Sequence, residues 1–125
     1  MSYRVLVVSS DEIALDGTLD VLNHAGFDAK GAATFQAASK ALSQETPDLL
    51  IADERLGQFN GLQLVVRGHA ASPRMRAIVT SNALDRVLES DARHLNAQCL
   101  VRPVDPHEWL GPVLRTFEEP VRLSA

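Results

Sequence analysis

The chain of 125 residues is long enough for one hydrophobic core and short for two, so we expect a single domain over residues 1–125. Its net charge of −4, with Lys and Arg scattered along the chain, argues against direct binding of nucleic acid. The single cysteine, Cys99, excludes an internal disulfide, and no apolar run is long enough for a signal peptide or a membrane span, so we expect a cytoplasmic protein without a membrane partner.

Short aliphatic runs alternate with longer stretches of helical period along the chain. This alternation indicates βαβ units around a parallel sheet. We expect five strands, at residues 4–8, 28–32, 48–52, 76–80 and 98–101. The first, third and fourth are continuous apolar runs, which are typical of strands buried on both faces. The second, "DAKGA", is less apolar and is expected at a sheet edge.

Three helices are expected between the first four strands. The second covers residues 33–42 with Thr34 as its N-cap, and the third begins near residue 62, after the Gly- and Asn-bearing loop "ERLGQFNG", and ends before Pro73. The first ends at Gly26. Its expected apolar face consists of Ile13, Leu15, Leu19, Leu22 and Ala25.

Two more helices are expected in the last third of the chain. The final one opens with Asp105 as N-cap and Pro106 at the first helical position, where the missing N–H costs nothing. The predicted apolar faces are Leu84, Val87, Leu88, Ala92 and Leu95 for the fourth helix, and Trp109, Leu110, Val113, Leu114 and Phe117 for the fifth.

Polar and charged side chains stand where four of the expected strands end. In an open α/β sheet, ligands and reactive groups gather beyond the carboxyl ends of the strands, because the loops converge there. We therefore expect one site with a central carboxylate, hydroxyls on one side and a guanidinium on the other. Its candidate residues are Ser9, Ser10 and Asp11 after the first strand, Asp53 after the third, Thr80 at the end of the fourth, and Arg102 after the fifth.

These segments resemble the receiver domain of bacterial two-component response regulators. "PDLLIADERLGQFNGLQL" is similar to the phosphoacceptor segment of that family, with Asp53 at the phosphorylated position and Gly61 where the family usually has glycine. "AIVTSNA" resembles the fourth strand, which ends in a hydroxyl residue at Thr80. "CLVRPVDPHEWL" resembles the fifth strand with its basic residue, here Arg102, and the last helix.

The resemblance implies a flavodoxin-like (CheY-like) α/β fold, with a five-stranded parallel sheet in the order 2-1-3-4-5 and helices on both faces. It implies a role in phosphorelay signal transduction, with a histidine kinase or another signalling protein as partner. Receivers commonly bind partners through the face made by the fourth helix, fifth strand and fifth helix, and a homodimer is left open.

The chain departs from the family pattern at the expected site. Receivers usually carry two acids after the first strand, which bind Mg²⁺ beside the phosphoacceptor, and here Ser9 and Ser10 stand at those positions. The usual lysine after the fifth strand is Arg102, and the aromatic residue often found in that strand is Cys99. Arg55 stands where a receiver supplies a backbone carbonyl to the metal.

Replacing two carboxylates by hydroxyls removes two formal charges from the implied metal site. Each close pair of unit charges near a surface interacts by on the order of 4 kcal/mol before desolvation is subtracted. We therefore expect Mg²⁺, the possible cofactor, to bind weakly or not at all. The candidate metal positions are Asp53, Asp11 (which would have to reach back into register), Ser10 and Arg55.

We interpret the chain as a degenerate receiver that is not an enzyme, acts through protein-protein interaction, and has an Asp53–Arg102 ion pair in its site. The alternative is a working receiver that takes a phosphoryl group on Asp53 from a histidine kinase with Mg²⁺. A third class, a flavodoxin-like nucleotide binder, would need a phosphate-binding loop that this sequence lacks. Plainer alternatives stay open: Ser9, Ser10 or Asp11 as caps of the first helix, Thr80 as an ordinary strand end, and Arg102 as a surface charge.

Overall fold

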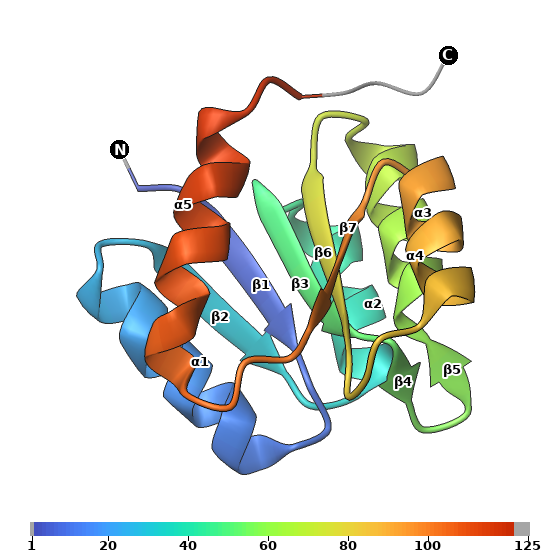
Figure 1. The fold of residues 1–125 in the computed structure, drawn as a ribbon. Coiled ribbons are helices and arrows are strands. Elements are labelled where there is room, and N and C mark those ends of the chain that lie inside the picture. The colour runs from blue at the N-terminus through green and yellow to red at the C-terminus, as the bar shows by residue number, and fades with distance from the viewer. Residues whose placement is uncertain (1, 122–125) are drawn as a thin grey trace.

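Five parallel strands form the central sheet of the computed structural model, which describes residues 2–121 (Figure 1). Their order across the sheet is β2-β1-β3-β6-β7. Counted within this sheet alone, that is the predicted order 2-1-3-4-5, so the fold class is confirmed. The strands are β1 (Arg4–Val8), β2 (Asp28–Ala32), β3 (Leu49–Asp53), β6 (Arg76–Ser81) and β7 (Gln98–Val101).

Helices cover both faces of the sheet (Figure 1). One face carries α1 and α5, and the other carries α2, α3 and α4. A 3₁₀ turn, η1, leads directly into α5. The bounds are α1 (Glu12–His24), α2 (Phe35–Gln44), α3 (Gly61–Ala71), α4 (Arg86–His94), η1 (Pro106–Trp109) and α5 (Leu110–Glu118).

The hydrophobic core has two halves, one on each face of the sheet. Successive side chains of a strand point to opposite faces, so the apolar runs of β1, β3 and β6 supply both halves. Leu6, Leu50 and Val79 pack with α2, α3 and α4. Val7, Ile51 and Ile78 pack with α1, Trp109 and α5. This double use explains why the central strands are continuously apolar.

Side-chain caps begin the helices at the carboxyl edge of the sheet. The predicted N-caps Thr34 and Asp105 are confirmed, because each accepts a hydrogen bond from a backbone N–H of the following turn. Asn60 caps α3 in a reciprocal capping box with Gln63. The helix starts are therefore defined by local hydrogen bonds, and this defines the loops around the site.

Five side chains predicted on buried helix faces are exposed instead, one of which is Ala25, the C-cap of α1. Ile13 is 87% exposed, because it lies two positions before buried Leu15 and so on the opposite side of α1. Leu84 is 72% exposed, because it precedes α4 rather than belonging to it. Val87 and Leu114 are 72% and 50% exposed, and each adjoins in sequence the residue that its helix buries, Leu88 or Val113.

The predicted loop between β3 and α3 contains a β-hairpin. Its strands are β4 (Arg55–Leu56) and β5 (Phe59–Asn60), joined by a turn in which Gly57 has a φ of 65°. Positive φ favours glycine, which explains the residue at that position. Leu56 is buried in the core, so the hairpin is anchored beside the end of β3.

Candidate functional site

Asp53 ends β3 at the centre of the sheet's carboxyl edge, and it is buried. Both of its carboxylate oxygens accept hydrogen bonds from hydroxyls of neighbouring strands. Ser9 Oγ donates to Oδ2 at 2.7 Å, and Thr80 Oγ1 donates to Oδ1 at 2.8 Å. The parallel register places these groups together, because Asp53 is paired with Thr80 and Ala52 with Val8, the residue before Ser9.

Arg102 forms an ion pair with Asp53 but no hydrogen bond to it. Its Nη1 lies 4.0 Å from Asp53 Oδ2 and 3.6 Å from Asp11 Oδ2, and its Nη2 donates to Asn82 Oδ1 at 2.9 Å. The expected Asp53–Arg102 ion pair is therefore present, although its two charged groups are 4.0 Å apart. Asn82 holds one end of the guanidinium, so the other end lies between two carboxylates and hydrogen-bonds to neither.

Ser10 and Arg55, two of the other predicted site residues, line the same cavity as Asp53, but neither they nor Asp11 hydrogen-bonds to it. Ser10 is exposed at the mouth of the site. Asp11 caps α1, because its Oδ1 accepts the backbone N–H of Ala14 at 3.1 Å, while Oδ2 faces Arg102. Arg55 is exposed and begins β4, where it pairs with Asn60.

A cavity of about 590 Å³ opens beside Asp53. Sequence reasoning missed four polar residues of its lining, which are Glu54, Asn82, Asp85 and Arg86. Asn82 could have been found, because it follows β6 at the same sheet edge as Thr80 and directly after Ser81. Arg86 begins α4, and its position depends on where that helix starts.

The residues around Asp53 do not fit a magnesium ion. Mg²⁺ needs near-octahedral oxygen coordination and usually one or two carboxylates. Within residues 2–121, no group of three or more His, Cys, Asp or Glu side chains could hold a metal. Both oxygens of Asp53 already accept hydroxyl hydrogen bonds, and the Arg102 guanidinium lies 4.0 Å from one of them, where it would repel a cation.

Gly61 is required by the close approach of α3 to the site. A Cβ at this position would lie 2.2 Å from the backbone oxygen of Asp53, a distance that no real carbon-oxygen contact allows. Without a side chain here, the first residue of α3 can pack directly against the end of β3. The glycine therefore sets the position of the Asp53 backbone.

Cys99 lies in β7 and is partly exposed. Burial raises the pKa of its thiol, and the negative charges of Glu89, Glu54 and Asp85 raise it further. A raised thiol pKa means less thiolate at neutral pH, and the thiolate is the reactive form. Cys99 therefore behaves as a small packing residue at the edge of the core.

The fold and the site together define a class of protein. The fold is a doubly wound α/β domain with a buried aspartate at the end of its central strand. The aspartate accepts a hydrogen bond from a hydroxyl of the next strand and lies near a cation that follows the edge strand. This is the arrangement of a signalling receiver. The chain belongs to the response regulator receiver domain family, whose model matches residues 5–111. It is a receiver domain of two-component signalling.

Solved structures support this fold. A CheY-like receiver domain protein from Methanospirillum hungatei has a TM-score of 0.86 at 23% identity, covering 94% of this chain and 95% of that one. CheY4 of Vibrio cholerae gives 0.83 at 19% identity, covering 93% and 99%. The BeF3-activated receiver domain of Thermotoga maritima DrrB gives 0.80 at 20%, covering 95% and 100%.

At these identities the structural likeness shows the fold alone. No curated protein sequence matches the chain. None of the helices in the described part of the chain has the length and apolar character needed to cross a bilayer.

Proposed function

We propose that this receiver domain signals in the cytoplasm without being phosphorylated, as a binding module and not as an enzyme. The observation that carries the proposal is the state of Asp53, whose two oxygens accept hydrogen bonds from Ser9 and Thr80 while Arg102 stands 4.0 Å away. A carboxylate held in this way is a poor nucleophile. Its charge is compensated by groups of the protein itself.

The chemistry of phosphoryl transfer supports this reading. Bringing phosphate oxygens up to a carboxylate requires a divalent cation to screen the negative charges. Ser9 contributes a neutral hydroxyl to Asp53, and Asp11 is engaged as the cap of α1. Each missing carboxylate weakens Mg²⁺ binding by on the order of 4 kcal/mol before desolvation, so we expect the affinity to fall by several powers of ten.

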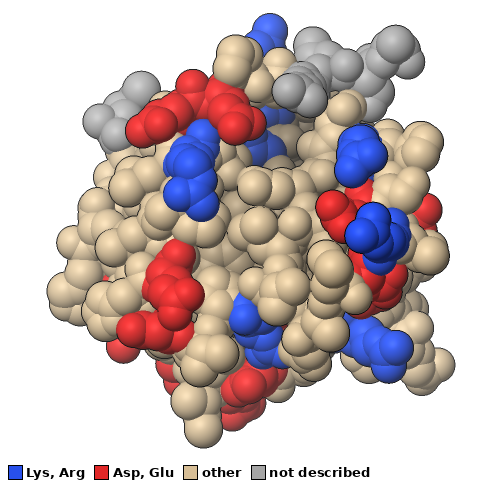
Figure 2. Space-filling model, viewed as in Figure 1, with Lys and Arg blue, Asp and Glu red and all other residues tan. Residues whose placement is uncertain are grey.

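The proposed partner is another signalling protein or a second copy of this chain. Exposed apolar side chains mark the surface around β7, and Val104 just after it is 98% exposed. Figure 2 shows this side: charged side chains lie over α4 and α5, and the surface between them is largely uncharged. The exposed large apolar residues of the chain from α4 to α5, together with Leu84 just before α4, are Leu84, Val87, Val101, Val104 and Leu114. An apolar patch with a charged rim is typical of protein interfaces.

The alternative is a working phosphoacceptor that takes a phosphoryl group from a histidine kinase. One observation favours it: Asp53 borders a cavity of about 590 Å³ that is also lined by Thr80 and Arg102. A phosphoryl group on Asp53 would meet a hydroxyl and a guanidinium in that space. This alternative requires Mg²⁺ to bind despite the serines at positions 9 and 10.

Incubation with beryllium fluoride or acetyl phosphate and millimolar Mg²⁺ separates the two functions. Native mass spectrometry and ¹⁹F NMR would detect an adduct on Asp53. We expect none with the natural sequence. A stable adduct that disappears in Asp53→Asn would overturn the proposal and establish the working receiver.

A gain-of-function variant makes a negative result informative. Ser9→Asp combined with Ser10→Asp restores two carboxylates beside Asp53, and we expect it to bind Mg²⁺ in a titration that leaves the natural protein unchanged. The matched control is Ser43→Asp combined with Ser90→Asp, which adds the same charge at exposed positions on α2 and α4. Equal Mg²⁺ binding by both double variants would mean that the serines of the site do not limit metal affinity.

A further inference from the structure

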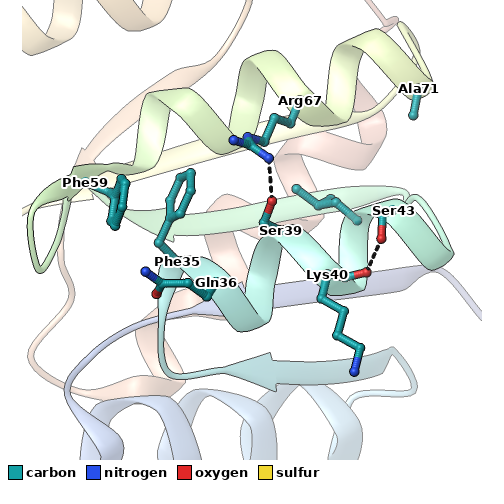
Figure 3. Close-up of a pocket in the computed structure, with 9 residues that line it drawn as sticks. Phe35, Gln36, Ser39, Lys40, Ser43, Phe59, Arg67 and Ala71 are labelled. Carbon is teal, nitrogen blue, oxygen red and sulfur yellow. Dashed lines mark hydrogen bonds between the residues drawn. The ribbon is translucent and has the colours of Figure 1, made fainter.

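A groove of about 670 Å³ lies between α2 and α3 (Figure 3). None of the residues that line it lines the cavity beside Asp53. The groove is therefore separate from the phosphoacceptor site, and its own side chains determine what it can bind.

Aromatic rings form one end of this groove. Phe35 of α2 and Phe59 of β5 stack with ring centroids 4.3 Å apart and planes 12° from parallel. Figure 3 shows the two rings side by side where the groove begins. Phe59 is only partly buried and supplies most of the exposed aromatic surface, since Phe35 and Leu42, which also line the groove, are buried. The groove thus offers apolar surface on which an aliphatic or aromatic side chain could dock.

Arg67 holds its charge in place over the groove. Its guanidinium carbon lies 5.2 Å from the centre of the Phe35 ring, and its Nη1 donates a 2.7 Å hydrogen bond to Ser39 Oγ. Figure 3 shows the side chain reaching from α3 across to α2. A guanidinium that is already ordered loses little side-chain entropy when an anion binds, and it can bind a carboxylate with two hydrogen bonds.

The groove is positively charged although the chain carries a net charge of −4. Its charged lining residues are Lys40 and Arg67, and no Asp or Glu lines it. Throughout residues 2–121, neither cation forms an ion pair with a carboxylate. Two uncompensated cations beside apolar surface therefore select for a ligand that is both acidic and apolar.

We propose that this groove binds an acidic segment of a partner protein. An apolar side chain of the segment packs against Phe35 and Phe59, a carboxylate pairs with Arg67, and a second carboxylate reaches Lys40 at the rim. Two cations on an acidic protein are too few for nucleic acid, whose binding depends on many phosphate contacts. The inference does not depend on the state of Asp53.

The test is a selection of random dodecapeptides on the full chain, followed by measurement of synthetic fluorescent copies by anisotropy. We expect the enriched peptides to combine Asp or Glu with an aliphatic or aromatic anchor. Arg67→Glu should weaken their binding by about tenfold or more, since it replaces attraction by repulsion. Lys30→Glu is the matched control, because it makes the same charge change on β2 outside the groove, and its effect should stay below about twofold.

Several outcomes would overturn the proposal. The first is a selection in which acidic residues are not enriched. The second is that Arg67→Glu binds the selected peptides as tightly as the natural protein does. The third is that heparin or anionic vesicles bind more tightly than the peptides and that this binding is lost in Arg67→Glu. Should Arg67→Glu lose the fold by circular dichroism, the neutral pair Arg67→Gln and Lys40→Gln replaces it. The selected peptides must then bind the Arg67→Gln and Lys40→Gln variant more weakly than the natural protein. Their binding to the natural protein must also weaken as the salt concentration is raised.

Discussion

Ser9 Oγ donates a 2.7 Å hydrogen bond to Oδ2 of Asp53, although the two residues are 44 positions apart in the chain. The bond crosses from the end of β1 to the end of β3, which are paired in parallel. A position that carries a metal-binding acid in the resembled family is thus a hydrogen-bond donor to the central aspartate. The stability of the site therefore depends on a hydroxyl from a remote segment of the chain.

Ser9→Ala should destabilise the protein by about 1–3 kcal/mol, because a buried carboxylate oxygen then loses its hydroxyl partner. Urea denaturation of the natural and variant proteins measures this change in the free energy of unfolding. Ser43→Ala is the control, since the exposed Ser43 hydroxyl bonds only to the Lys40 carbonyl, and its effect should stay within about 0.5 kcal/mol. Equal effects at both serines would contradict the role given to Ser9.

Arg102 and Asp11 should be only weakly coupled. Arg102 Nη1 lies 3.6 Å from Asp11 Oδ2, and the Asp11 carboxylate is half exposed. A double-mutant cycle of Arg102→Gln and Asp11→Asn should give a coupling below about 1 kcal/mol, and asparagine preserves the helix cap. A coupling of about 3 kcal/mol or more would indicate a buried two-pronged ion pair instead.

Gly61→Ala should destabilise the protein by about 1–3 kcal/mol or more, because the added Cβ would collide with the Asp53 backbone oxygen at 2.2 Å. NMR spectra of the backbone amides should show shifts around Asp53. Gly111→Ala provides the comparison in α5, where the new Cβ would meet only the flexible end of Arg115, and alanine favours a helix over glycine. A neutral or stabilising Gly61→Ala would mean that α3 can move away from β3 without cost.

Glu89→Gln should make Cys99 more reactive toward iodoacetamide. Burial is the largest cause that raises the pKa of this thiol, and the charge of Glu89 is the next. Removing that charge lowers the pKa toward its ordinary value, so the thiolate fraction at mildly alkaline pH rises and the pH-rate profile moves to lower pH. Glu118→Gln is the control, since Glu118 is not among the acids that raise this pKa. An unchanged pH-rate profile in Glu89→Gln would mean that Glu89 does not raise the pKa of Cys99.

Most of the strands could be predicted because their signal is local. The apolar runs of β1, β3 and β6 and the helical period between them determine an alternating α/β fold, and the order of the sheet follows from the resemblance to receivers. The predicted closeness of Asp53 and Thr80 also follows, because residues at the ends of neighbouring parallel strands lie side by side.

Side-chain direction could not be predicted in the same way. Ile13 and Leu114 are apolar and stand at helical spacing, yet each lies outside the stripe that its helix buries. Periodicity defines which residues share a face, but the sheet and the neighbouring helices decide which face is covered. The hairpin at positions 55–60 was missed for a related reason, since its strands have two residues each, too few to show a pattern.

By itself, the sequence determined the class of fold, the family and the residues that gather at the sheet edge, because these depend on hydrophobic periodicity and on motifs along the chain. Only the tertiary structure decided that Asp53 bonds to Ser9 and Thr80, that Arg102 turns toward Asn82 and Asp11, and that Arg67 is ordered above Phe35. The reason is physical: hydrogen bonds and ion pairs depend on ångström distances between segments remote in sequence, and a linear pattern carries no such distances.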